Sequence, residues 1–305
     1  MTKEWTLAAM AAACTALAVG GSQNAHALEG GVSPFPVGST GEFIAALPPI
    51  PGVFAVEQFN YSSSNGLYDN GGNKLPVPFK LSAYSATTRV LASYGTQWLG
   101  ANLYSQLVVP AVSLHTEIAG DSETHRGLSN ITLTPIMMRW GFSQYANLTG
   151  GLDISLPTGS YSPTRPSVAV GYTSWQPVVA YRYNDPSGLD VGLSNRFMFN
   201  QKNGDTGYRS GNAYAGEFTA GWHFGSWKVG VVGGYLNQFS DDSQNGASIN
   251  ANRARSFAIG PSVVYNAGPV NISVNYQQGV YAANMAKSNA LWVNFALPLW
   301  VKPGL

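Results

Sequence analysis

Stretches in which apolar and polar residues alternate recur along most of this chain, and they constrain its fold more than any other feature. In one of them, Leu189, Val191 and Leu193 alternate with Asp190 and Gly192. Because successive side chains of a β-strand point to opposite faces, each stretch predicts a strand with one apolar and one polar face. Twelve such strands are predicted, at residues 53–62, 79–92, 98–111, 129–142, 146–156, 173–183, 188–199, 213–224, 227–239, 255–265, 269–279 and 288–300.

The connections between these predicted strands alternate between short and long. The short connections are residues 93–97, 143–145, 184–187, 225–226 and 266–268, and the long ones are 63–78, 112–128, 157–172, 200–212, 240–254 and 280–287. Short turns at one end and long loops at the other are typical of a closed transmembrane β-barrel. The sequence therefore predicts an all-β fold, a transmembrane antiparallel β-barrel of about 12 strands over residues 53–305, with both chain ends in the periplasm.

The composition supports a barrel over a soluble β-sandwich, which would also alternate. Charged residues make up 10 % of the chain, against about 25 % in an average soluble domain. The polar face of the predicted strands is mostly Gly, Ser, Asn and Thr, and no segment after the first 27 residues has the roughly 18 apolar residues of a transmembrane helix. Aromatic residues gather near strand ends, as in the interfacial girdles of barrels: Tyr181, Tyr183, Trp222, Phe224, Trp227, Tyr235, Phe239, Tyr265, Tyr281 and Trp300.

The first 27 residues predict a signal peptide. Lys3 precedes a short apolar core, and Ala25-His26-Ala27 is a cleavage motif, so the mature chain is expected to begin at Leu28. Cys14 is the only cysteine, and the residues before it do not favour a lipoprotein signal. The mature chain would then lack thiols. A formal net charge of +1 also gives no basic surface for nucleic acid.

A segment rich in Pro and Gly, residues 28–52, precedes the first predicted strand. Proline and glycine at this density exclude a strand or a long helix. The segment is either a periplasmic tail or a plug folded into the lumen, and the plug would shelter its apolar side chains from water. These plug candidates are Phe35, Phe43, Ile44 and Leu47.

Charged residues within the predicted strands are candidates for the lumen. A charge that faces lipid at mid-depth costs about 2–4 kcal/mol, so most of these side chains should point inward. Arg139 shares sequence parity with the apolar Leu133 and Met137, which leaves its direction open. The other candidates, for a structural network or a constriction, are Arg89, Asp153, Arg182, Asp190, Arg196 and Glu217.

An apolar entrance would suit a hydrophobic cargo, although simple packing at the rim explains the same residues. The mouth candidates are Leu75, Val77, Phe79 and Tyr161.

Catalytic and metal-binding patterns are weak in this sequence. His223 and Ser226 form the nearest Ser–His candidate, but Gly225-Ser226 reads as a turn. Residues 241–246 loosely resemble a calcium loop without its bidentate Glu, so a turn is favoured there. No enzyme activity, metal, nucleotide or other cofactor is predicted.

Several motifs stand out along the chain: Leu28-Glu29-Gly30-Gly31-Val32-Ser33-Pro34, Gly72-Asn73-Lys74-Leu75-Pro76-Val77-Pro78-Phe79, Leu156-Pro157-Thr158-Gly159-Ser160-Tyr161, Asn203-Gly204-Asp205-Thr206 and Phe257-Ala258-Ile259-Gly260-Pro261. Together they resemble the meta-pathway phenol-degradation family of outer-membrane transporters. The resemblance extends through essentially the whole mature chain, and it departs from the usual barrel end at Pro298 and at the five residues after Trp300. It implies a transporter-like barrel that is often associated with the degradation of aromatic or other hydrophobic compounds.

Pattern and resemblance together predict a monomeric outer-membrane channel for passive uptake of small hydrophobic compounds, with aromatic compounds as a candidate class. Its expected partners are outer-membrane lipid, these solutes and, during biogenesis, the barrel-assembly machinery. A general diffusion porin and a structural or adhesive barrel are the alternatives.

Overall fold

The computed structural model describes residues 27–303. Its main feature is a closed antiparallel barrel of twelve strands. These strands are β1 (Gly52–Tyr68), β2 (Phe79–Trp98), β3 (Ala101–Ile118), β5 (Thr132–Gly141), β6 (Ala146–Ser155), β7 (Ser174–Asn184), β8 (Leu189–Asn200), β10 (Ala213–Phe224), β11 (Trp227–Gln238), β14 (Arg255–Ala267), β15 (Val270–Ala283) and β16 (Met285–Val301).

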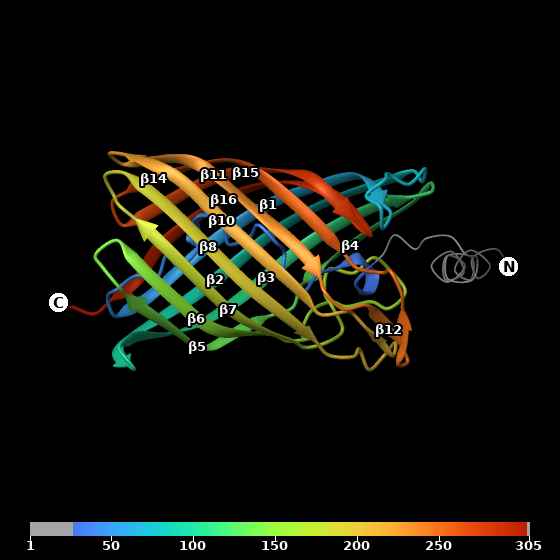
Figure 1. Ribbon diagram of the computed structural model, residues 1–305, viewed down its shortest axis with the longest axis horizontal. Helices are drawn as coiled ribbons and strands as arrows, with labels where there is room; N and C mark the ends of the chain where they lie inside the picture. The colour runs from blue at the N-terminus through green and yellow to red at the C-terminus, as the bar shows by residue number, and fades with distance from the viewer. Residues whose placement is uncertain (1–26, 304–305) are drawn as a thin grey trace.

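Each barrel strand pairs with its neighbours in the sequence, and β1 pairs with β16 to close the ring. The strands are strongly tilted against the long axis of the molecule (Figure 1). Closure pairs every strand on both sides, which removes the open edges that a membrane does not tolerate. The predicted all-β barrel is therefore confirmed.

Short strands extend the barrel at its long-loop end. β4 (Asp121–Leu128) pairs with the outer half of β3, so much of the loop expected at 112–128 is a hairpin. β9 (Tyr208–Arg209), β12 (Asp242–Gln244) and β13 (Ala247–Ile249) form a small separate sheet. Asn245 and Gly246 connect β12 to β13 with positive φ angles, which confirms the turn expected at 241–246.

Two connections differ from the sequence prediction. The turn after β2 is not at 93–97, because β2 continues past a bulge there and turns at Leu99 and Gly100, both with positive φ. The irregular loop expected at 280–287 is also wrong, because β15 continues to Ala283 beside β14 and β16 starts at Met285 beside β1. Asn284, with a φ of 52°, lies between them, and the two strands pair with each other only up to Gln277 and Ala290. In both places the strands continue past the expected turn, and only one or two residues with positive φ mark the change of direction.

The two faces of the barrel wall differ as the alternation predicts. On β8, Asp190 and Ser194 face the lumen and are buried, whereas Leu193 on the opposite face is 57 % exposed. In the part of the chain that the structure describes, no helix has the length and apolarity needed to cross a membrane. Among the described residues, the helical elements are two 3-10 turns, η1 (Glu29–Gly31) and η2 (Gly41–Phe43).

A bulge in β5 decides the direction of Arg139. The pairing of β5 with β6 shifts between Leu133 and Met137, around Pro135. Leu133 is 39 % exposed on the outer face, while Met137 pairs with the buried Tyr104 on the inner face. Because a bulge adds a residue, side chains beyond it change face, and Arg139 points into the lumen despite its parity with Leu133.

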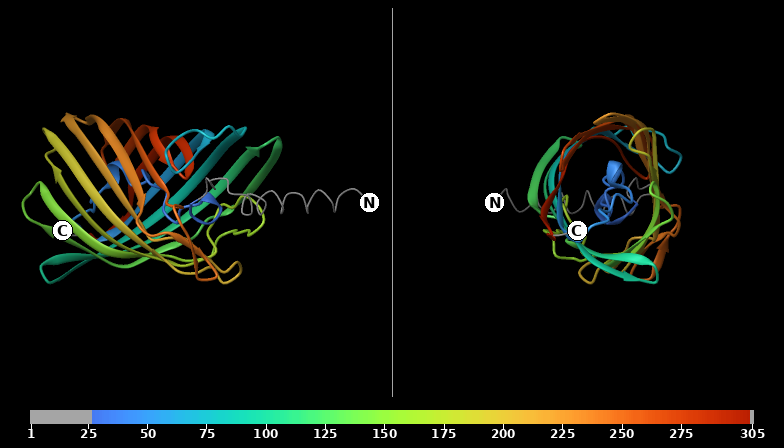
Figure 2. Two further views of the ribbon diagram at one scale, coloured as in Figure 1. Left: turned by 45° about the vertical axis from the view of Figure 1, so that its right-hand side comes forward. Right: turned by 90° about the vertical axis from the view of Figure 1, so that its left-hand side faces the viewer.

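The N-terminal segment, here residues 27–51, lies inside the barrel (Figure 2). It begins at the long-loop end, where the Ala27 amide donates to the Asn284 carbonyl, and reaches Gly52 at the short-turn end, beside Val301. The ends of the described chain therefore lie at opposite ends of the barrel (Figure 1). The prediction that both chain ends share the periplasmic side is wrong, because this segment passes through the lumen.

Candidate functional site: the lumen and its N-terminal segment

Polar groups from the loops hold the start of the N-terminal segment. The Glu29 carboxylate accepts hydrogen bonds from Tyr161 Oη at 2.9 Å, Asn203 Nδ2 at 2.8 Å and Thr206 Oγ1 at 2.5 Å. Burial first, then the neighbouring Glu29 charge, raises the pKa of Tyr161 far above its ordinary value. The Tyr161 hydroxyl is therefore a fixed donor to the segment.

The middle of the segment binds the wall mainly through backbone groups. The amides of Gly38 and Thr40 donate to Glu217 Oε1 at 2.7 and 3.1 Å. Gln58 Nε2 donates to the Ser39 carbonyl, and Gln277 Nε2 donates to the Gly38 carbonyl. Strands on opposite sides of the ring thus satisfy a backbone that has no sheet or helix of its own.

A buried ionic cluster surrounds Glu42, which is 4 % exposed. Glu42 Oε2 lies 2.5 Å from Lys228 Nζ, and Ser262 Oγ donates to Glu42 Oε1 at 2.7 Å. Lys228 Nζ also lies 3.0 Å from Asp190 Oδ2, and Asp190 forms a two-point ion pair with Arg182. Arg182 donates in turn to the carbonyls of Glu42 and Ile44. Each buried charge has an opposite partner, as burial requires.

Apolar contacts complete the lumen. Phe35 packs in a buried cluster with Leu28, Met198 and Leu236, and the Arg196 guanidinium lies 4.0 Å from the centre of its ring. Ile44 is fully buried against Ala180. Phe43 and Leu47 are half-buried. The predicted plug candidates thus lie inside the barrel, and closure of the lumen to solutes remains a prediction.

The wall leaves space for this segment at Gly234. A Cβ atom there would lie 2.5 Å from Val37 Cγ1 and 3.1 Å from the backbone nitrogen of Gly38. The segment therefore approaches the wall too closely for any larger residue at this position.

The structure brings the predicted lumen charges together. Asp153 pairs with Arg196 at 2.7 Å and accepts a hydrogen bond from Thr134. Arg89 is within electrostatic reach of Asp153, Glu217 and Arg196. The charged lining of the lumen thus contains all six predicted candidates: Arg89, Asp153, Arg182, Asp190, Arg196 and Glu217.

Two members of the lining were missed. Lys228 lies next to a turn, but it shares parity with the inward Gly230, Val232 and Gly234, so the alternation of β11 could have identified it. Glu42 gave no such signal, because its segment has no periodicity.

The proposed mouth residues pack rather than line an opening. Phe79 is 7 % exposed and packs on Leu67, with Leu75 and Leu81 beside them. Val77 is half-buried, and Tyr161 binds Glu29. A polar cavity of about 440 Å³ lies instead at the long-loop end, next to Gln238, Asp241 and Arg253, and an apolar groove of about 740 Å³ crosses the outer wall near Phe59 and Leu128.

The histidine near Ser226 has a structural environment. His223 Nε2 lies 3.2 Å from Asp190 Oδ2, within the Glu42 cluster, and Ser226 occupies the turn between β10 and β11. Within residues 27–303, no group of three or more potential ligands could hold a metal ion.

The fold is similar to that of outer-membrane channels. An outer membrane channel from Pseudomonas putida F1 superposes with a TM-score of 0.76 at 16 % identity, covering 85 % of this chain and 98 % of that one. The NanC porin covers 80 % of this chain and 100 % of its own at 13 % identity, with a TM-score of 0.43. The AIDA-I transport unit from Escherichia coli covers 81 % and 89 % at 12 % identity, with a TM-score of 0.49. Only the first likeness is strong enough to support the shared fold.

A search of curated protein sequences finds no match to this chain. A protein-family model matches residues 64–295, which is most of the barrel. The resemblance carried by the sequence motifs is therefore confirmed. The chain belongs to the family described as "Putative MetA-pathway of phenol degradation".

Proposed function

We propose that this protein is an outer-membrane channel for passive uptake of small hydrophobic compounds, aromatic ones included, and that the N-terminal segment controls passage. The observation that carries the proposal is the segment itself, which contacts the lumen wall along its length and places Phe35 and Ile44 inside it. Phe35 is 6 % exposed and Ile44 is fully buried, so these side chains would offer an aromatic ring an apolar surface only when the segment moves away from the wall. The family description, which refers to phenol degradation, supports an aromatic substrate class.

A diffusion channel for polar solutes is the second candidate. It is favoured by the charged lining, in which Arg89, Arg139 and Arg196 face the lumen. Small ions and sugars exchange hydrogen bonds with such a lining, whereas an apolar solute gains nothing from it.

Flux into proteoliposomes separates these functions. The full mature protein and a variant without residues 28–51 are compared for a toluene-sized aromatic and a sugar of similar size, after subtraction of protein-free liposomes. Faster entry of the aromatic than of the sugar, with a further rise in the deletion variant, is expected. Equal entry of both solutes would favour the diffusion channel, and no entry in either protein would leave a structural barrel.

A further inference from the structure

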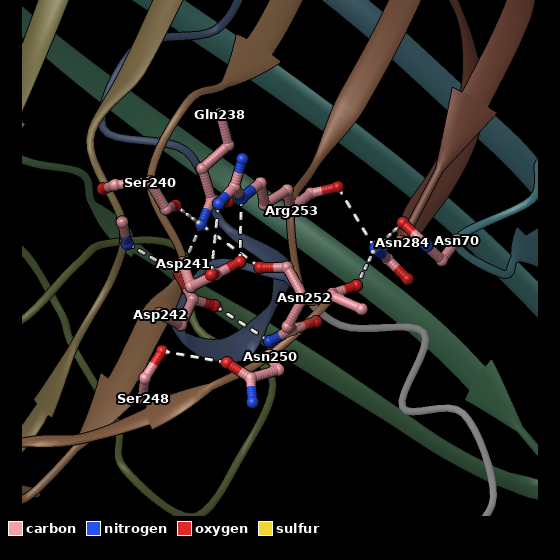
Figure 3. Close-up of polar contacts among 12 residues, drawn as sticks. Asn70, Gln238, Ser240, Asp241, Asp242, Ser248, Asn250, Asn252, Arg253 and Asn284 are labelled. Carbon is pink, nitrogen blue, oxygen red and sulfur yellow. Dashed lines mark hydrogen bonds and ion pairs between the residues drawn. The ribbon is translucent and has the colours of Figure 1, made fainter.

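Asp242 is a completely buried carboxylate at the long-loop end of the barrel, and neutral groups surround it. Its Oδ1 accepts hydrogen bonds from the Gly211 amide and Gln238 Nε2, both at 2.6 Å. Its Oδ2 accepts a hydrogen bond from Tyr208 Oη. It also accepts one from Asn252 Nδ2 at 3.0 Å (Figure 3). Among residues 27–303, no ion pair includes Asp242, and burial raises the pKa of this carboxyl. A buried anion of this kind lacks a cation.

The fifth donor to Asp242 is the backbone nitrogen of Leu28, at 2.9 Å from Oδ2. Leu28 is the residue at which the mature chain is expected to begin, since Ala25-His26-Ala27 precedes it. Cleavage there would turn this amide into an α-ammonium group without moving the nitrogen. An ammonium group is the cation that the buried carboxylate lacks, and such a hydrogen bond is stronger than one from a neutral amide.

The backbone of Leu28 also favours a chain that starts at this residue. Leu28 has φ 67° and ψ 142°, a conformation that side-chain-bearing residues rarely adopt. The angle φ depends on the preceding carbonyl carbon, so it disappears when the Ala27–Leu28 bond is cut. The Leu28 side chain is 2 % exposed and packs with Phe35, Met198 and Leu236, which would hold the new terminus from its other side.

We propose that Asp242 is the binding site for the α-ammonium group that signal-peptide cleavage creates at Leu28, and that this ion pair anchors the N-terminal segment across the lumen. The position fits, because Asp242 lies at the end of the barrel opposite Gly52, where the segment joins β1. The proposal rests on the predicted cleavage and does not depend on which solute is transported.

The test measures the reactivity of the α-amine in protein purified from the outer membrane. Mass spectrometry identifies the first residue, and reductive dimethylation followed by peptide mapping gives the labelling rate of that amine separately from lysines. In the folded wild-type protein we expect a first residue of Leu28 and labelling at least about tenfold slower than in the denatured protein, as for an amine held protonated by a buried carboxylate.

Asp242→Asn should abolish this protection while the barrel still shows heat-modifiable migration on gels. Asp241→Asn is the matched control, because Asp241 is the adjacent carboxylate but pairs with Arg253 at 2.8 Å (Figure 3), whereas the Leu28 nitrogen donates to Asp242. Protection should persist in this variant. A first residue other than Leu28, or equal protection in Asp242→Asn, would overturn the proposal.

A second protein decides the question if Asp242→Asn does not fold. A chain produced without its leader and refolded retains an initiator Met before Leu28, so the Leu28 nitrogen stays a neutral amide. Its folded form should label faster than the wild-type protein at the same pH. Equal labelling of the two proteins would show that burial alone, and not Asp242, protects the terminus.

Discussion

At the scale of the residue, the lumen is organised by a small number of buried charges that satisfy one another. Glu42 of the N-terminal segment and Asp190 of the wall share Lys228, and Arg182 holds both Asp190 and the backbone of the segment. A buried pair adds little net stability, but loss of one partner leaves an uncompensated buried charge. The cluster therefore fixes where along the lumen the segment lies.

Removal of one charge from this cluster should loosen the segment. Glu42→Gln keeps the shape of the side chain but leaves Lys228 with less compensation, and breaking a buried pair costs about 3–5 kcal/mol. We expect a folded barrel with higher and noisier single-channel conductance in planar bilayers. Glu117→Gln, which breaks an exposed pair with Lys80, is the control and should leave conductance unchanged. Identical traces for the two variants would show that Glu42 does not anchor the segment.

At the scale of the element, each strand combines a regular alternation with local exceptions that set its contacts. β11 presents Val229 and Val231 outward and Lys228 and Val232 inward. The bulge in β5 and the absent side chain at Gly234 are the exceptions that matter for the lumen. One changes which residues face inward, and the other makes space for the segment.

A larger residue at Gly234 should displace the N-terminal segment. Gly234→Leu places atoms where Val37 and Gly38 now lie, while the strand itself tolerates leucine. We expect faster cleavage of the segment by an added protease, with the barrel core remaining resistant. Val231→Leu on the outward face of the same strand provides the control, and unchanged cleavage in Gly234→Leu would contradict the close approach.

The bulge in β5 predicts opposite environments for two positions of equal parity. The mature chain lacks cysteine if the leader that contains Cys14 is removed, so single-cysteine variants are simple to make. A fluorophore on Leu133→Cys should be quenched by brominated lipid, and one on Arg139→Cys should be quenched by aqueous iodide instead. Quenching of both fluorophores by lipid would mean that the strand alternates without interruption.

At the scale of the whole molecule, the barrel and the N-terminal segment have separable roles. The ring closes through strand pairing alone, since β1 pairs with both β2 and β16 and does not need residues 27–51 for its hydrogen bonds. The segment instead fills the lumen and, through Glu42, offsets part of the positive charge of its lining. A barrel without it should fold and should expose the charges of its lining.

Deletion of residues 28–51 should therefore make the channel select anions. The lining then keeps the basic Arg89, Arg139, Arg182, Arg196 and Lys228 against the acidic Asp153, Asp190 and Glu217, while Glu42 is lost. An excess of fixed positive charge attracts anions to a narrow pore. The reversal potential in a KCl gradient measures this selectivity, and cation selectivity in the deletion variant would show that the inward charges have been misassigned.

The sequence by itself determined the barrel, most of its strands and most of its lumen charges. These features repeat with period two and are imposed locally, because a lipid-facing side chain must be apolar and an inward one may be polar. Asp190, Arg196 and Glu217 could be placed inside for that reason. The turns at Leu99-Gly100 and Asn284 could not, since one or two residues with positive φ leave little trace in the pattern.

Only the tertiary structure decided the position of the N-terminal segment and its partners. The segment has no periodicity, and its contacts join residues far apart in the chain, such as Glu42 with Lys228 and Leu28 with Asp242. Such pairings depend on how a closed ring brings distant strands around one axis. For the same reason the direction of Arg139 required the bulge at Pro135, and the first described residue lies at the end of the barrel that the sequence did not assign to it.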